Sequence, residues 1–189
     1  MAEIYFVRHG QSEANAANLV AGWRDYPLTE EGVNQATKEA QEIKRKLHIG
    51  GMISSPLMRA HDTAKIIAQG NNFPVEDIVL LDGLKEKGYG ELEGCISPEE
   101  LRGVSDENIV RAGGETFDVF AERVERVNQQ ILYHLAQVGI SSSLLIVGHA
   151  GFYRMAQCVS KGLPPSEMVN MEKPNNSILL RYPIGQNWA

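Results

Sequence analysis

The chain has 189 residues and a formal net charge of −6, and its apolar and charged fractions, 43% and 22%, are ordinary for a globular protein. This length predicts one domain over residues 1–189 with a substantial buried core. The acidic balance, with neither a basic tail nor a basic stripe, argues against a surface for nucleic acid or for an anionic membrane. A protein of this charge that binds an anion must concentrate its few cations in a pocket.

The two cysteines, Cys95 and Cys158, are too few for a disulfide framework and have no metal-ligand spacing. We expect both to be buried or half-buried thiols in a reducing compartment. The first residues enter an apolar run without a signal-peptide pattern, and no apolar run is long enough to span a bilayer. These features predict a cytoplasmic protein.

Short apolar runs alternate with longer segments in which apolar residues recur every three or four positions. The short runs are typical of buried strands, and the longer segments have the period of helices that cover one face of a sheet. The expected strands are residues 4–7, 52–54, 78–81, 144–147 and 177–182. Because parallel strands need crossover helices, this alternation predicts a single three-layer α/β/α domain with a mostly parallel central sheet.

Capping residues mark the ends of the expected helices. Thr29 and Thr116 are expected N-caps, Ser55 followed by Pro56 has the pattern of a helix start, and Gly139 ends the longest helix. The first helix is expected to run to the glycines at 50–51 and to bury Val33, Ala36, Ala40, Ile43 and Leu47 along one face. The shorter expected helices are residues 98–102 and 150–160. The expected loops are residues 10–18, the glycine-rich residues 82–97 and the aperiodic residues 103–114, the last of these a flap.

The first strand runs directly into Arg8, His9 and Gly10. This places a guanidinium group and an imidazole at the carboxyl end of a strand, where open α/β sheets bind ligands. An arginine can hold a phosphate while a neutral histidine attacks its phosphorus. The tripeptide alone is weak evidence, because a histidine at a strand end is more often structural.

A second strand ends in the same way, with Gly148, His149, Ala150 and Gly151. In a parallel sheet the two ends lie at one edge, so His9 and His149 are expected to face each other. The small residues would let backbone amides approach an anion at the N-terminus of the following helix. The alternative is a tight turn that needs glycine and in which the histidine is incidental.

Two further side chains could complete such a site. Arg59 is expected in the first turn of the helix that begins at Ser55, close to the positive end of that helix, unless it is a solvated surface arginine. A glutamate of the glycine-rich loop could protonate a leaving alkoxide, which is typically worth ~10²–10⁴-fold in rate. Composition does not choose among Glu86, Glu91 and Glu93.

Four motifs in this order resemble the histidine phosphatase superfamily, the clan of cofactor-dependent phosphoglycerate mutases and related phosphatases. The motifs are Arg8-His9-Gly10, Ser54-Ser55-Pro56-Leu57-x-Arg59-Ala60-x-x-Thr63-Ala64, Glu86 with Tyr89-Gly90-x-Leu92-x-Gly94, and Gly148-His149-Ala150-Gly151. The resemblance covers essentially the whole chain. Residues 22–32 and 113–116 also resemble the early loop and the Gly-Glu-Ser/Thr element of the family.

The resemblance implies a role for each matching position. His9 would be the nucleophile that becomes phosphohistidine, and Glu86 would be the proton donor. The residues expected to bind the substrate phosphate are Arg8, Asn15, Gly22, Arg59, His149 and Ala150. No metal or other cofactor is implied, because the cations of the pocket would stabilise the charge on the transferred phosphoryl group.

Two reactions compete for this site. Glu86 and His149 are 63 positions apart, whereas the mutases carry a longer insert there, with cations that grip the substrate. The mutases also usually have Glu-Arg-His-Tyr where residues 86–89 read Glu-Lys-Gly-Tyr, and often Ser or Thr at the position of Ala21. These departures favour a phosphatase that acts on small phosphorylated metabolites over a mutase. A non-catalytic phosphate or phosphoprotein binding module is disfavoured, because every core position of the family pattern is filled.

Overall fold

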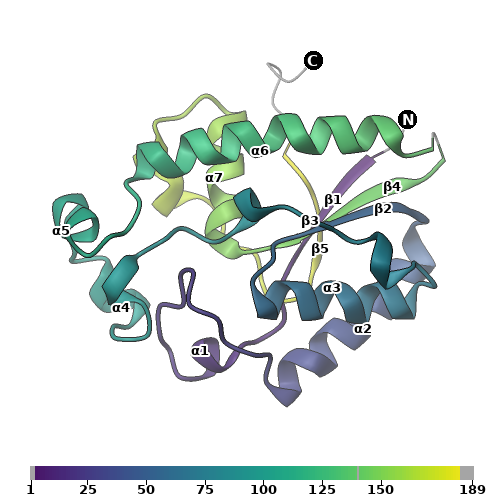
Figure 1. The fold of residues 1–189 in the computed structure, drawn as a ribbon, viewed down its shortest axis with the longest axis horizontal. Coiled ribbons are helices and arrows are strands. Elements are labelled where there is room, and N and C mark those ends of the chain that lie inside the picture. Colours follow the sequence, from purple (N-terminus) through teal and green to yellow (C-terminus); the bar gives the residue numbers. More distant parts are fainter. Residues whose placement is uncertain (1–2, 140, 184–189) are drawn as a thin grey trace.

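A five-stranded sheet forms the centre of the computed structural model, which describes residues 3–139 and 141–183 (Figure 1). Two long helices cover each face of this sheet. The strands are β1 (Glu3–Arg8), β2 (Ile49–Ser54), β3 (Val79–Leu80), β4 (Ser143–Gly148) and β5 (Leu179–Arg181). The covering helices are α2 (Glu30–Lys46) and α3 (Met58–Gly70) on one face, and α6 (Phe117–Gln137) and α7 (Ala150–Ser160) on the other. The predicted three-layer α/β/α domain is confirmed.

The strand order is β3-β2-β4-β1-β5, and all neighbours are parallel except β1 and β5. Strands β1 and β4 therefore lie side by side and end at the same edge, where Arg8 pairs with Gly148. The next residue after β1, His9, donates its backbone N–H to the carbonyl oxygen of Gly148 at 3.0 Å. The structure thus confirms that the two strands that lead into histidines share one edge of the sheet.

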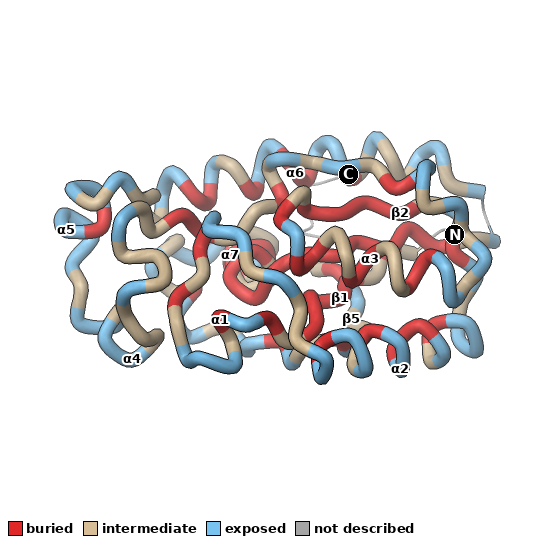
Figure 2. Tube along the Cα trace, turned by 60° about the horizontal axis from the view of Figure 1, so that its bottom comes forward, coloured by how far each residue is buried: buried red, intermediate tan, exposed pale blue. Residues whose placement is uncertain are grey.

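Side chains of the central strands alternate between two apolar cores, one on each face of the sheet. Phe6 and Ile146 pack with α6 and α7, whereas Val7 and Val147 pack with α2 and α3. All six residues of β4 are buried, as expected for a strand that is covered on both faces. In β1 and β2 the last three residues of each strand are likewise buried, and Figure 2 shows both strands as mostly buried. The strand ends at the site are therefore anchored by packing from both sides.

Threonine caps begin the two longest helices, as predicted. The Thr29 hydroxyl accepts a hydrogen bond from the amide of Gly32 in α2, and the Thr116 hydroxyl accepts one from Val119 in α6. The other helical elements are short. They are α1 (Glu13–Ala16), α4 (Pro98–Leu101), α5 (Asp106–Arg111) and the 3₁₀ turns η1 (Val75–Asp77), η2 (Asp82–Leu84), η3 (Gly90–Leu92) and η4 (Pro165–Asn170).

Two segments that were expected to be plain loops contain helices. In residues 10–18, Ser12 and Asn15 form a capping box at the start of α1. In residues 103–114, the Ser105 side chain caps α5. A helix of one or two turns has too few apolar repeats to show a period, so the prediction of loops was wrong at both places.

The course of α2 also differs from the prediction. The helix ends at Lys46, and residues 50–51 lie within β2 and do not terminate the helix. Val33 was expected in the buried stripe, but it is 42% exposed. Two adjacent glycines after a helical pattern predict the end of a helix. Here they belong to a strand, because β2 pairs with β4, and this long-range contact leaves no local pattern in the sequence.

The start of α3 is shifted by two residues. The helix begins at Met58 and not at Pro56. The carboxylate of Asp25 accepts a hydrogen bond from the amide of Met58 at 2.7 Å, and so serves the first turn from a distant loop. The predicted N-cap, Ser55, is buried and directs its hydroxyl to the site described below.

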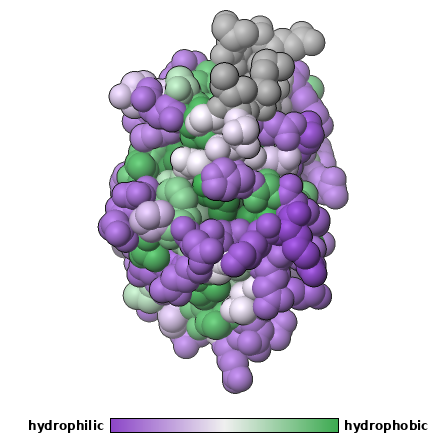
Figure 3. All heavy atoms as spheres, turned by 90° about the vertical axis from the view of Figure 1, so that its right-hand side faces the viewer, coloured by the Kyte–Doolittle hydropathy of each residue, from purple (hydrophilic) through white to green (hydrophobic). Residues whose placement is uncertain are grey.

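The surface is largely hydrophilic on the face shown in Figure 3, where apolar side chains are visible between polar ones. Cys95 is exposed and Cys158 is buried, so the expectation of burial was wrong for Cys95, which lies on a surface turn after η3. Within residues 3–139 and 141–183, no helix combines the length and the apolar character needed to cross a membrane.

Candidate active site

The site is built at the carboxyl edge of β1 and β4, where two histidine rings meet. His9 follows β1, and His149 is the N-cap residue of α7 directly after β4. Their ring centroids are 5.2 Å apart, with the planes inclined at 59°. Both residues are buried, with 4% and 0% of their surface exposed. The two rings therefore lie next to each other, as the sequence predicted.

The hydrogen bonds of His9 fix its tautomer. Its Nδ1 atom lies 2.6 Å from the carbonyl oxygen of Gly10, which can only accept, so Nδ1 carries the proton. Burial and the nearby charges of Arg59 and Arg8 lower the pKa of His9 well below its usual value. The ring is therefore neutral at pH 7, with the lone pair on Nε2.

His149 is held by a residue that the sequence assigned only to a helix cap. The Oγ atom of Ser55 lies 2.8 Å from His149 Nε2, and it also accepts a long hydrogen bond of 3.3 Å from the amide of Leu57. Burial and the Arg59 and His9 groups lower the pKa of His149 well below its usual value. A serine in a helix-start motif has no local feature that reveals a partner 94 residues away.

Arg59 lies in the first turn of α3 and is only 1% exposed, so the alternative of a solvated surface arginine is wrong. Its Nη2 atom donates to the carbonyl of Gly22 at 2.7 Å, and Nη1 donates to that of Arg24 at 3.1 Å. Burial lowers the pKa of Arg59 from its usual value, although a guanidinium group stays charged at neutral pH. The turn at residues 22–24 thus fixes the orientation of the buried Arg59 guanidinium group.

Several buried side-chain nitrogens of the site lack hydrogen-bond partners. Among the residues that the structure describes, five buried side-chain nitrogen or oxygen atoms lack a hydrogen-bond partner. Three of the five are nitrogens of the cluster: Arg8 Nε, Arg59 Nε and His149 Nδ1. Buried donors without acceptors cost free energy, on the order of 1–3 kcal/mol each and more for charged groups. An anion with several acceptor oxygens would satisfy them together.

Glu86 lies beside this cluster on the segment between η2 and η3. Its Oε2 atom accepts a hydrogen bond from the amide of Gly151 at 2.9 Å, and Oε1 accepts one from the amide of Lys87 at 2.9 Å. Gly151 is two residues after His149, so the carboxyl group lies at the N-terminus of α7. A Cβ atom at Gly151 would be 2.1 Å from Glu86 Oε1, so the contact requires glycine.

The two competing glutamates lie elsewhere. The Glu93 carboxylate accepts hydrogen bonds from the amides of Tyr89 and Arg24, both at 2.8 Å, and it links two loops. Glu91 is exposed. Of the three candidates that composition left open, the structure therefore places Glu86 against the histidine-bearing turn.

The remaining predicted phosphate-binding residues have different surroundings. Asn15 uses Oδ1 to accept a hydrogen bond from the amide of Ser12 at 3.2 Å, and this bond belongs to the cap of α1. Gly22 has a φ of +50°, and its carbonyl holds Arg59. Ala150 is the first residue of α7, where backbone amides have no acceptor within the helix, although the next amide, that of Gly151, donates to Glu86. Anion binding by these three residues stays a prediction.

Two contacts near Glu86 had no signal in the sequence. The indole Nε1 of Trp23 donates to the carbonyl of Glu86 at 2.7 Å. Arg123 of α6 donates to the same carbonyl at 3.0 Å. Both contacts depend on the tertiary fold and not on local pattern.

Comparison with known proteins identifies the family. The model described as histidine phosphatase superfamily (branch 1) matches residues 4–188. A 2,3-bisphosphoglycerate-dependent phosphoglycerate mutase of Parvibaculum lavamentivorans is 35% identical over 131 residues, which span 64% of this chain and 62% of the mutase. An adenosylcobalamin/alpha-ribazole phosphatase of Salmonella typhimurium is 32% identical over 157 residues, which span 78% of this chain and 74% of that protein.

Solved structures share the fold. A mycobacterial glucosyl-3-phosphoglycerate phosphatase has a TM-score of 0.78 at 19% identity, with 95% of this chain and 90% of that chain covered. The alpha-ribazole phosphatase of Shigella flexneri has a TM-score of 0.75 at 24% identity, with 94% and 88% covered. Since the family model spans nearly the whole sequence, this chain belongs to branch 1 of the histidine phosphatase superfamily.

Proposed function

We propose that the protein is a phosphomonoester hydrolase that acts on small phosphorylated metabolites through a phosphohistidine at His9. The observation that carries this proposal is the set of three unpartnered buried nitrogens, from Arg8, Arg59 and His149, around a neutral imidazole. A phosphoryl group would accept hydrogen bonds from the two arginines, whose positive charges would stabilise the charge on its equatorial oxygens, and it would lie beside the neutral His149 ring.

The reaction has two steps. His9 Nε2 attacks the phosphorus, the bond from phosphorus to the leaving oxygen breaks, and Glu86 gives its proton to that oxygen. Glu86 is then a carboxylate, and it takes a proton from a water molecule that attacks the phosphohistidine. The phosphorus–nitrogen bond breaks, phosphate leaves, and both His9 and Glu86 return to their starting protonation states. The positive charges of Arg8 and Arg59 stabilise the negative charge of the phosphoryl group in both steps.

The surroundings of Lys87 support hydrolysis over mutase activity. Lys87 stands where the related mutases usually have an arginine, but it is fully buried and its amine donates to the carbonyl of Glu115. Its Nζ atom also lies 4.7 Å from the ring centroid of Tyr89 and 5.1 Å from that of Phe117. This cation is engaged by the protein, and Gly88 after it has no side chain to grip a substrate.

A phosphoglycerate mutase is the second candidate, because a relative that carries this name is 35% identical over 131 residues. The two functions are distinguished by a panel of phosphomonoesters assayed for phosphate release, with isomerisation of 3-phosphoglycerate measured in parallel. Release of phosphate at least as fast as any isomerisation supports the hydrolase. Transfer to phosphoglycerate that outruns transfer to water would make the protein a mutase.

The Glu86→Gln variant should separate two kinds of substrate. Phosphorylation of His9 by an alkyl phosphate should slow by about 10²–10⁴-fold, because the alkoxide needs a proton as it leaves. An activated aryl phosphate such as p-nitrophenyl phosphate needs little help from an acid and should lose much less. Rapid-quench measurement of phosphoenzyme formation on both esters tests this.

Glu91→Gln and Glu93→Gln are the matched controls for this test, since both remove a carboxylate from the same loop. Neither should change the ratio of the two rates. If Glu86→Gln slows phosphoenzyme formation equally with both esters, Glu86 is not the proton donor.

Activity should survive treatment with EDTA. In the proposed mechanism Arg8 and Arg59 stabilise the phosphoryl charge, and within the described part of the chain no group of three or more His, Cys, Asp or Glu side chains could hold a metal ion. Phosphate release before and after exhaustive chelation measures this. Complete loss that Mg²⁺ or Zn²⁺ restores would contradict the mechanism.

A further inference from the structure

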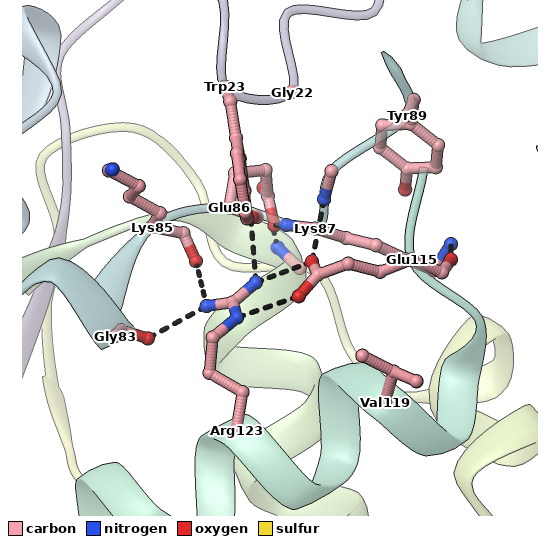
Figure 4. A network of polar contacts seen from close by, with 12 residues as sticks. Gly22, Trp23, Gly83, Lys85, Glu86, Lys87, Tyr89, Glu115, Val119 and Arg123 are labelled. Carbon is pink, nitrogen blue, oxygen red and sulfur yellow. Dashed lines mark hydrogen bonds and ion pairs between the residues drawn. The ribbon is translucent and has the colours of Figure 1, made fainter. Parts of the chain in front are cut away.

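The segment that carries Glu86 has no regular secondary structure from residue 86 to residue 89. Its position depends on contacts from other parts of the chain. Figure 4 shows that Arg123 reaches from α6 to carbonyl oxygens of Glu86 and of the residues just before it. Its Nη1 atom donates to Gly83 at 2.7 Å and to Lys85 at 2.8 Å, and Nη2 donates to Glu86 at 3.0 Å.

Glu115 holds this guanidinium group in place. Arg123 Nε donates to Glu115 Oε1 at 2.8 Å, and Nη2 donates to Oε2 at 2.6 Å, so the pair is bidentate. The two side chains are only 13% and 11% exposed. Glu115 Oε2 also accepts a hydrogen bond from the amide of Gly88 at 2.8 Å, which fixes the far end of the segment. The ion pair therefore grips the chain on both sides of Glu86.

The same network extends to the cation of the site. The Glu86 carbonyl accepts hydrogen bonds from both Arg123 and the indole of Trp23. Trp23 lies between Gly22 and Arg24, whose carbonyls hold Arg59. The Glu86 carbonyl is thus joined through Trp23 to the turn that holds Arg59, and this turn keeps its own hydrogen bonds to Arg59 when Arg123 is replaced.

A buried ion pair is a costly way to stabilise a fold, since well-packed apolar residues are often as stable. What an apolar pair could not provide is a set of directed donors to three carbonyls and an acceptor for one amide. We propose that Arg123, oriented by Glu115, is a positioning residue that holds the Glu86 carboxyl group against the N-terminus of α7 in the geometry for proton transfer. This role rests on the proposed hydrolase mechanism.

The test compares the rates of His9 phosphorylation by two esters with different leaving groups, in variants of α6. Arg123→Met should slow phosphorylation of His9 by an alkyl phosphate by about 10²-fold, the effect expected for a catalytic group misplaced by about 1 Å. The p-nitrophenyl ester, which needs little acid catalysis, should slow by less than about fivefold. Arg123→Lys should recover little of the loss, because an ammonium group cannot form the planar fork.

Arg126→Lys is the matched control, because Arg126 is an exposed arginine of the same helix, with 69% of its side chain accessible. It should behave as the wild type on both esters. Combining Arg123→Met with Glu86→Gln should add no further selectivity between esters, since the acid that Arg123 positions is already gone. Selective losses that add in the double variant would overturn the positioning role.

Hydrogen exchange gives a readout that does not need activity. In Arg123→Met the amides of residues 86–88 should exchange faster, while those of β1 and β4 stay protected. Unchanged exchange in residues 86–88, or equal rate losses on both esters, would overturn the proposal. If Arg123→Met does not fold, Glu115→Gln replaces it, with the same expectations.

These outcomes are distinct from a failure of the proposed function. A wild-type protein that forms no phosphohistidine refutes the hydrolase mechanism, and the positioning role falls with it. Ester selectivity that changes in Glu86→Gln but not in Arg123→Met or Glu115→Gln refutes the positioning role alone.

Discussion

His9→Ala is expected to abolish the phosphoenzyme and to lower kcat by at least about 10⁴-fold, the scale of loss seen when a covalent nucleophile is removed. The physical reason is the state of the ring: Nδ1 is committed to the Gly10 carbonyl, so Nε2 is the only nitrogen with a free lone pair. Acid-labile, base-stable phosphoprotein should be trapped in the wild type by rapid quench after mixing with substrate. None should be trapped in the variant.

Controls for this prediction address folding and the choice of histidine. His48→Ala removes an exposed histidine and should retain wild-type turnover. Because His9 is buried, thermal unfolding and hydrogen exchange at β1 should be compared in both variants. A folded His9→Ala protein with near-normal turnover would show that another residue accepts the phosphoryl group.

Arg59→Ala is expected to lower the rate of His9 phosphorylation by about 10²–10³-fold, as for the loss of one preorganised donor to a developing charge. The loss should exceed that expected from charge alone, because Arg59 also ties Gly22 and Arg24 together. Arg59→Lys keeps the charge but cannot reach two carbonyls and an anion at once, so it should recover only part of the rate.

Orthovanadate is a suitable probe for this variant, because it can adopt the geometry of a phosphoryl group in transfer. Its inhibition constant should rise at least about 10-fold in Arg59→Ala, in line with the loss of a charge-assisted hydrogen bond from Nε and of a nearby positive charge. Arg45→Ala, on the exposed side of α2, is the matched control and should leave the constant unchanged. If the rate and the vanadate affinity both stay within about threefold of the wild type, the free-energy change is below about 0.7 kcal/mol. Arg59 would then not bind the phosphoryl group.

The sequence predicted those parts of the site that follow from periodicity. The apolar runs before His9 and His149 are continuous, which indicates strands buried on both faces, and parallel strands end at one edge. The pairing of Arg8 with Gly148 realises this expectation directly. The carboxyl ends of β1 and β4 were therefore predicted to within one residue from the hydrophobic pattern, whereas the bounds of β3 and β5 were predicted too wide.

Other features depend on contacts between distant segments, and no local pattern encodes them. The choice of Glu86 over its neighbours depends on the amide of Gly151, 65 positions later. Lys87 and Arg123 look like solvated charges in the sequence, yet both are turned inward by backbone carbonyls of other segments. Ser55 looked like a helix cap and instead contacts His149. Burial of a polar side chain is determined by its partner, and the partner is visible only in the folded chain.

The backbone pairing between Gly88 and Glu115 bears on how relatives of this protein could diverge. The Glu115 amide donates to the Gly88 carbonyl at 2.9 Å, and the Gly88 amide donates to the Glu115 carboxylate, so these two hydrogen bonds join the two ends of residues 89–114. Closing a loop costs only about 0.6 kcal/mol more for each doubling of its length. A change in the length of residues 94–114 is therefore expected to cost little chain entropy as long as the contacts of Glu93 with Tyr89 and Arg24 are kept. Since Arg8, His9, Arg59, Glu86 and His149 all lie outside residues 89–114, such a change leaves every residue of the proposed mechanism in the sequence.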